Sequence, residues 1–214
     1  LDVIDNHKDK FNVKFLAANS NVYSLINQTE KFKPEFICIY DKSKYKKLKD
    51  KVNTTKVLSG HEGLMELCEL SNIDIILNSI VGYSGLEPTL KIIESGTDIA
   101  LSNKESIVQA GHLVMNLAKL KNVNIFPVDS EHSAIWQCLV GEKKSKIKKI
   151  ILTASGGPFR NFPKNKFSKI SVSQALNHPN WKMGKKITID SATMMNKGFE
   201  MIEAFWLFSI NPKN

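Results

Sequence analysis

The spacing of apolar and polar positions changes along the chain. In roughly the first 125 residues, short apolar runs alternate with amphipathic stretches. The apolar runs predict strands at Val13–Ala18, Glu35–Tyr40, Thr55–Leu58, Ile73–Ser79, Asp98–Ser102 and Val123–Val128. The amphipathic stretches predict helices at Asn21–Phe32, Lys42–Lys51, Gly63–Leu70, Glu87–Ser95 and Glu105–Leu120. Helices alternating with strands that are apolar on both faces indicate an α/β domain with a doubly wound, Rossmann-like parallel sheet.

A different pattern follows Val128. A long segment from Gly156 to Lys186 is rich in Gly, Pro, Asn and Lys, and a loop of that length usually has a function or is disordered. The elements predicted around it are a helix at Ser133–Val140, strands at Ile147–Thr153 and Ile187–Ile189, and a helix from about Ala192 to Phe208. We therefore expect a domain boundary near residue 128, followed by an α+β domain.

Composition narrows the class of protein. The chain is 42% apolar and 24% charged, which is ordinary for a globular protein, and no apolar run approaches the ~20 residues of a membrane span. The formal charge of +9 comes from 29 Lys and a single Arg, Arg160, beside 19 Asn. Nucleic-acid sites favour Arg for its bidentate contacts, so the excess of Lys and Asn indicates codon bias rather than a nucleic-acid partner.

The three cysteines, Cys38, Cys68 and Cys138, are odd in number and widely spaced. They form no CxxC pair, which argues against a zinc ribbon or a disulfide framework. Because all three lie in apolar segments, we expect buried thiols in a reducing compartment.

A cofactor could bind where the strand Val13–Ala18 ends. NAD sites usually carry an acidic residue there to hold the ribose hydroxyl, whereas this strand ends in the neutral residues Asn19, Ser20 and Asn21. Neutral donors do not repel a phosphate, which favours NADPH; a helix cap at Asn19 or Ser20 is an equally plausible alternative. No GxGxxG motif is present, and the spaced glycines Gly82 and Gly85 are a weak substitute.

Carboxylates mark a possible metal site. Asp129 and Glu131 follow an apolar strand, and side chains two positions apart on an extended chain point the same way. They could share Mg²⁺ or Mn²⁺, although a polar helix start is an even alternative. Glu200 lies among apolar residues and shares a helix face with Asn196, whereas Glu203 is expected to be solvated.

Other polar residues could bind an anion. Ser155 precedes Gly156 and Gly157 in a tight turn, where backbone N–H groups can approach a phosphate; an ordinary turn is the alternative. Ser191 stands at a predicted helix start, which also favours anions. Lys104 follows a strand and could bind an anionic or carbonyl substrate.

Five segments, in their order along the chain, resemble the 1-deoxy-D-xylulose 5-phosphate reductoisomerase family. They are Asn103–Ser106, Pro127–Ser133, Ser155–Phe159, His178–Gly184 and Asp190–Glu200, and the likeness covers nearly the whole chain. The resemblance implies metal-dependent rearrangement of 1-deoxy-D-xylulose 5-phosphate. Reduction by NADPH to 2-C-methyl-D-erythritol 4-phosphate would follow, in non-mevalonate isoprenoid precursor synthesis. Another NADPH-dependent oxidoreductase, such as a semialdehyde dehydrogenase, would need a nucleophilic Cys in a turn, and a basic nucleic-acid-binding module would leave these motifs unexplained.

The resemblance also implies roles for individual residues. Mn²⁺ or Mg²⁺, with Co²⁺ as a third option, would be held by Asp129, Glu131 and Glu200. Lys104 and Ser130 would hold the end of the substrate that the metal binds. The phosphate of the substrate would be held by Ser155, Ser191, Asn196 and Lys197. A flap at about 155–186 would close over the substrate with His178 and Trp181. The nicotinamide side would be lined by Asn103, Glu105 and Gly184, and the ribose side by Asn19, Ser20 and Asn21.

Compared with the family, this chain is expected to be a piece cut at both ends. It starts as if within a helix and lacks the glycine-rich cofactor loop and the carboxyl-terminal helical domain. We expect residues 1–128 to be a partial NADPH-binding domain, residues 129–214 to be the catalytic domain, and the piece alone to bind NADPH poorly. The whole protein is expected to be a homodimer without membrane or nucleic-acid partners. It would reside in an apicoplast-type plastid or, alternatively, in a bacterial cytoplasm.

Overall fold

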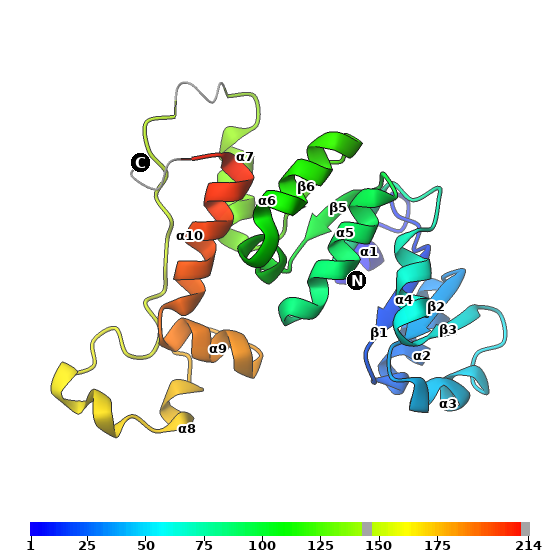
Figure 1. Cartoon of the computed structure of the whole chain (residues 1–214). Coiled ribbons are helices and arrows are strands. Elements are labelled where there is room, and N and C mark those ends of the chain that lie inside the picture. Colours follow the sequence, from blue (N-terminus) through cyan, green and yellow to red (C-terminus); the bar gives the residue numbers. More distant parts are fainter. Residues whose placement is uncertain (143–146, 211–214) are drawn as a thin grey trace. The chain divides into compact units, whose positions relative to one another are not determined.

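A computed structural model describes residues 1–142 and 147–210 (Figure 1). The chain divides into two compact units, which are described separately here. The first unit comprises Leu1–Ile76 and Leu90–Asp98, and the second comprises Leu77–Thr89 and Ile99–Asn214. This division lies before the boundary expected near residue 128, which stays a prediction.

The first unit is built on a parallel three-stranded sheet in the order β1-β2-β3. Phe15 pairs with Phe36, and Phe36 with Lys56, so the three strands are in register from their first residues. The elements are α1 (Asp2–Asn6), β1 (Phe15–Ala18), α2 (Val22–Phe32), β2 (Phe36–Ile39), η1 (Lys42–Lys44), α3 (Tyr45–Lys49), β3 (Lys56–Ser59) and α4 (Gly60–Cys68). The strands and helices predicted for this region are confirmed, as is a helix at the start of the chain.

Apolar residues of α2, β2 and α3 form the core of the first unit. Leu25, Ile37, Ile39 and Leu48 are fully buried. The α2 helix begins where Asn21 accepts a hydrogen bond from the backbone N–H of Ser24 at 3.0 Å. A cap was expected at Asn19 or Ser20, and the structure places it at the next residue, Asn21.

The second unit contains most of the remaining elements, while β4, α5 and β5 extend across the division. A second sheet has the order β4-β5-β6, with β5 and β6 parallel. The elements are β4 (Ile75–Asn78), η2 (Gly82–Gly85), α5 (Leu86–Glu94), β5 (Asp98–Leu101), α6 (Lys104–Lys121), β6 (Ile125–Pro127), α7 (Ser130–Leu139), η4 (Lys164–Lys169), α8 (Val172–Ala175), α9 (Lys185–Ala192) and α10 (Met195–Phe208). No helix among the described residues is long and apolar enough to cross a membrane.

Helices α6 and α10 pack side by side in the second unit (Figure 1). Their approach requires a glycine at residue 111, because a Cβ atom there would lie 2.3 Å from the indole of Trp206. This packing places the beginning of α6 beside the first turns of α10, where the polar residues described below meet.

Three expectations for local structure are wrong. Ile147–Thr153 forms no strand, since no neighbouring strand pairs with it among the described residues. Ile187–Ile189 lies inside α9, where Thr188 donates to the carbonyl of Gly184 at 2.8 Å and helical packing overrides β propensity. Cys138 is exposed on α7, whereas Cys38 and Cys68 are buried as expected.

Candidate functional site

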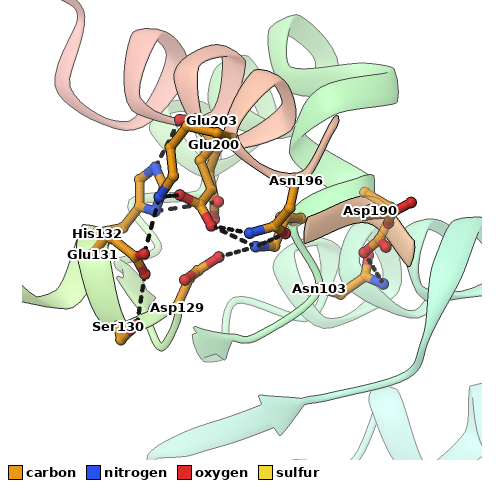
Figure 2. Close-up of polar contacts among 12 residues, drawn as sticks. Asn103, Asp129, Ser130, Glu131, His132, Asp190, Asn196, Glu200 and Glu203 are labelled. Carbon is orange, nitrogen blue, oxygen red and sulfur yellow. Dashed lines mark hydrogen bonds and ion pairs between the residues drawn. The ribbon is translucent and has the colours of Figure 1, made fainter. Parts of the chain in front are cut away.

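The predicted metal and substrate residues meet in one pocket of the second unit. It has a volume of about 540 Å³ and is bounded by the beginnings of α6, α7 and α10, by α9 and by the segments before and after α8. The predicted residues that line it are Lys104, Asp129, Ser130, Glu131, Ser155, His178, Trp181, Ser191, Asn196, Lys197 and Glu200. Figure 2 shows Asp129, Ser130, Glu131, Asn196 and Glu200 of this set.

Three carboxylates form the acidic centre of this pocket. Oxygen atoms of Asp129, Glu131 and Glu200 all lie within 4.8 Å of one another. Asp129 and Glu131 stand at the start of α7, while Glu200 is 1% exposed on α10. A set of carboxylate oxygens at this spacing fits a hard divalent cation such as Mg²⁺ or Mn²⁺.

The ammonium group of Lys104 lies among these carboxylates. It contacts Asp129, and it is 3.2 Å from Glu200 Oε1 and 2.8 Å from Asn196 Oδ1. Burial alone would lower the pKa of Lys104, but the charges of Asp129 and Glu200 outweigh it and raise that pKa. Lys104 is therefore a permanent cation in the site, and its position after β5 agrees with the role expected for it.

A second cation, Lys197, neutralises the other side of the cluster. Its ammonium group is 2.9 Å from Glu131 Oε1 and also contacts Glu200. Burial would raise the pKa of Glu131, but the Ser130 hydroxyl at 2.6 Å and Lys197 overcome this and hold the pKa at about 2. Burial raises the pKa of Asp129 despite Lys104. Two ammonium groups thus face three carboxylates, which leaves an excess of negative charge for a metal.

A separate part of the pocket is lined by hydroxyl and backbone groups. Ser155 Oγ lies 3.1 Å from His178 Nε2 and accepts from the backbone N–H of Gly157 at 3.2 Å. Gly157 has φ +67°, and a Cβ atom there would stand 2.6 Å from the carbonyl of Ser191. Only glycine allows the Ser155 turn to lie this close to the end of α9.

The histidine in this part of the pocket has a defined tautomer. His178 Nδ1 accepts from the backbone N–H groups of Asn180 at 3.2 Å and Trp181 at 3.0 Å. The ring proton therefore stands on Nε2 and is donated to Ser155. The Trp181 side chain is 66% exposed at the rim of the pocket.

The residues expected on the cofactor side do not line this pocket. Asn103 is buried and caps α6, accepting from the backbone N–H of Ser106 at 2.9 Å, while Glu105 pairs with Lys186. Gly184 stands at the beginning of α9. Asn19, Ser20 and Asn21 follow β1 in the first unit. Their cofactor roles stay predictions.

Sequence reasoning missed two buried residues beneath the carboxylates. Glu203 was expected to be solvated but is 1% exposed, because α10 turns that side chain inward with Glu200. It faces the ring of His132, which is fully buried and directly follows Glu131. The available signal was the spacing of Glu203 three residues after Glu200, which places both on one face of a helix.

Comparison with protein families decides between the alternatives. Residues 1–111 match the model of 1-deoxy-D-xylulose 5-phosphate reductoisomerase, and residues 125–208 match the model of its C-terminal domain. The chain belongs to the 1-deoxy-D-xylulose 5-phosphate reductoisomerase family. The resemblance in the sequence motifs is thereby confirmed.

Individual reductoisomerases agree over the whole chain. The enzyme of Bacteroides fragilis is 50% identical over 214 residues, which is 99% of this chain and 55% of that protein. The enzyme of Chloroherpeton thalassium is 47% identical over 213 residues, again 99% of this chain and 55% of that protein. The chain thus spans about half the length of these bacterial relatives.

Solved reductoisomerase structures confirm the α/β, Rossmann-like fold. A crystal structure of DOX-P reductoisomerase in complex with NADPH, fosmidomycin and magnesium has a TM-score of 0.90 at 41% identity. The Zymomonas mobilis enzyme in complex with NADPH has a TM-score of 0.91 at 38% identity. Each match covers 99% of this chain and 55% of the other.

Proposed function

We propose that the protein carrying this chain converts 1-deoxy-D-xylulose 5-phosphate into 2-C-methyl-D-erythritol 4-phosphate with NADPH and a divalent metal. The observation that carries the proposal is the meeting of Asp129, Glu131 and Glu200 in one pocket with the Ser155 turn. Reductoisomerases with this fold have been solved with NADPH and magnesium. Because the chain spans about half of its relatives' length, the activity belongs to the longer protein.

The carboxylate cluster is the proposed site for Mg²⁺ or Mn²⁺, with Co²⁺ as a third option. Asp129, Glu131 and Glu200 supply only oxygen donors, which is the set that these hard cations prefer. A bound ion would provide Lewis acidity toward the ketone and hydroxyl oxygens of the substrate. Ser130 holds one oxygen of Glu131 at 2.6 Å, so this ligand is oriented before any ion binds.

Lys104 is proposed to hold the same end of the substrate. Its raised pKa keeps it protonated, so it can donate to a carbonyl or hydroxyl oxygen. Contacts with Asp129 and Asn196 fix the ammonium group at the acidic centre. A cation held there also offsets negative charge that develops on an oxygen during rearrangement and reduction.

The phosphate of the substrate is proposed to bind between the Ser155 turn and the beginning of α10. Ser155, Ser191, Asn196 and Lys197 line the same pocket and together offer hydroxyl, amide and ammonium donors. Lys197 also contacts Glu131, so one side chain would link the phosphate to the metal ligands. Binding a remote phosphate positions the reacting carbons and lowers the entropic part of the barrier.

Residues 155–186 are the proposed flap. Trp181 is exposed, and its ring would lose contact with water by closing over bound substrate. His178 connects the flap to the turn, because its ring accepts from the backbone of Trp181 and donates to Ser155. Closure would thus couple the tryptophan to the residue expected on the phosphate.

Cofactor binding is proposed for two groups of residues. NADPH is proposed to bind with its ribose phosphate near Asn19, Ser20 and Asn21, whose side chains are neutral. Asn103, Glu105 and Gly184 are proposed for the nicotinamide side. A homodimeric assembly and a plastid location are predictions that rest on the family resemblance and on the Lys and Asn bias.

Loss of NADPH absorbance in the full-length protein tests this function. Turnover should require both 1-deoxy-D-xylulose 5-phosphate and a divalent metal. Glu131→Gln should lower it by about 100-fold or more, because a ligand carboxylate worth a few kcal/mol is lost. Glu142→Gln, at an exposed position of the same unit, is the matched control and should leave turnover unchanged. Full activity of Glu131→Gln would refute the assignment.

A further inference from the structure

We infer that Glu203, acting through His132, is a positioning residue that holds Asp129 and Glu131 of α7 in register with Glu200 of α10. Glu203 touches none of the proposed ligands directly, and the motifs single it out for no role. The inference rests on the proposed metal site, and its test separates failure of that site from failure of the pair.

The pair is buried and complementary (Figure 2). His132 is 0% and Glu203 is 1% exposed, and His132 Nδ1 lies 3.4 Å from Glu203 Oε2. Among the described residues, neither of these two atoms forms a regular hydrogen bond, so their 3.4 Å approach is a polar contact rather than a well-aligned bond. A buried polar atom without a partner costs free energy, so each of these two groups is stabilised by its contact with the other.

The opposite edge of the ring bonds directly to a ligand-bearing residue. His132 Nε2 lies 2.9 Å from the backbone carbonyl oxygen of Glu200. A carbonyl only accepts, so Nε2 carries a proton and Nδ1 is directed at Glu203. The ring of Phe208 lies nearly parallel to the imidazole, with ring centroids 6.2 Å apart and an interplanar angle of 6°. His132 therefore bridges α7 and α10 between two fixed contacts on α10.

The charge state of the pair supports this reading. Burial raises the pKa of Glu203 to about 8, and the nearby charge of Asp129 adds to the effect. A protonated Glu203 that donates to Nδ1 satisfies both atoms without burying an unpaired charge.

The consequence concerns the three carboxylates. His132 directly follows Glu131 in the chain, and its ring is bonded to the backbone of Glu200 itself. Without Glu203, the imidazole can tilt or change tautomer, and the spacing between the α7 and α10 carboxylates is no longer fixed. Loss of a partner that orients a metal ligand typically lowers metal affinity by about 10- to 100-fold.

A second metal site is the competing explanation. One ligand atom each of Asp129, His132 and Glu203 also lies within 4.8 Å of the others. The observed arrangement favours the direct pair, because His132 Nδ1 and Glu203 Oε2 are 3.4 Å apart, within the range of a direct polar contact. The stoichiometry of metal binding distinguishes the two.

The test measures Mn²⁺ binding to the 214-residue chain. The electron paramagnetic resonance signal of free Mn²⁺ reports how much of the ion stays unbound. Glu203→Met keeps the side-chain length but removes the donor, and should weaken binding by about 10-fold or more. Glu203→Gln restores a donor to Nδ1 and should bind within a few fold of the parent. Val114→Ala truncates another buried residue of the unit and controls for lost packing.

Each outcome has a distinct meaning. Unchanged affinity in Glu203→Met would overturn the inference if Glu200→Gln, measured alongside, loses binding. Unchanged affinity in Glu200→Gln as well would instead refute the proposed metal site. Two bound ions, one of them lost in Glu203→Gln, would favour the second metal site and overturn the pair. If Glu203→Met does not fold, His132→Phe keeps the ring stack on Phe208, removes both nitrogens and should show the same weakening.

Discussion

Replacing Lys104 with methionine would remove one of the two ammonium groups that face the three carboxylates. The Lys104 side chain is 9% exposed and lies 3.2 Å from Glu200 Oε1, which is itself buried. Lys197 would still neutralise Glu131 and Glu200, so Asp129 would lose its main partner. Methionine has a similar length and introduces no charge, which isolates the electrostatic effect.

The position of the ion pair sets the size of the effect. Removing one partner of a buried ion pair costs about 3–5 kcal/mol, because the other charge stays buried and unpaired. Because Lys197 still neutralises two of the carboxylates, we expect Lys104→Met to lower the free energy of unfolding by about 3 kcal/mol, near the lower end of that range. Lys186 forms ion pairs with Glu105 and Asp190 in the same unit but is 44% exposed. Lys186→Met should therefore cost no more than about 1 kcal/mol.

Tryptophan fluorescence during urea unfolding measures this difference. Trp136, Trp181 and Trp206 are the three tryptophans of the chain, and all belong to the second unit, so their signal reports that unit. Without divalent metal, Lys104→Met should unfold at a clearly lower urea concentration than the parent and Lys186→Met. Mg²⁺ at 100 times its dissociation constant contributes about 2.7 kcal/mol. It should stabilise Lys104→Met more than the parent, since no ammonium group competes for Asp129.

Two results would refute this reasoning. A midpoint for Lys104→Met equal to that of the parent would mean that the ammonium group does not neutralise the carboxylates. A Mg²⁺ effect equal in both proteins would mean that the ion does not bind where Lys104 does.

Two further predictions use the same chain. Gly157→Ala should lower the free energy of unfolding in urea more than Gly141→Ala does, by about 1 kcal/mol or more. Both residues have positive φ, but only residue 157 would place a Cβ against the Ser191 carbonyl. Equal losses would show that the Ser155 turn tolerates a side chain. At pH 8, iodoacetamide should modify exposed Cys138 first, whereas burial raises the pKa of Cys38 to about 11 and leaves little thiolate. Peptide mass spectrometry measures the order, and labelling of folded Cys38 at the rate of Cys138 would contradict it.

The sequence predicted the first unit well because its signals are local. Strands such as Phe36–Ile39 are short apolar runs, and the helix after β1 begins at a residue with a capping side chain. The segment 187–189 misled the prediction, because three residues rich in β-branched side chains resemble a strand. A strand needs a neighbouring strand to pair with. Here the bond from Thr188 to the Gly184 carbonyl and the Lys186–Asp190 ion pair favour a helix instead.

The proposed metal ligands could be predicted from the sequence, whereas the buried residues that contact them could not. Asp129, Glu131 and Glu200 could be grouped because family motifs carry them, although Glu200 lies 69 or more residues after the other two and on a different helix. The burial of Glu203 depends on how α10 packs against α6 and α7, and the only local signal of it was its spacing three residues after Glu200. His132 was likewise seen only as a neighbour of Glu131, since its partners come from α10.

The most direct test of the metal site is the anomalous scattering of Mn²⁺ in crystals of this chain. The account predicts one strong peak within about 2 Å of carboxylate oxygens from Asp129, Glu131 and Glu200. The peak should be absent in crystals of Glu200→Gln. A peak at His132 and Glu203, or no peak in this pocket at saturating Mn²⁺, would contradict it.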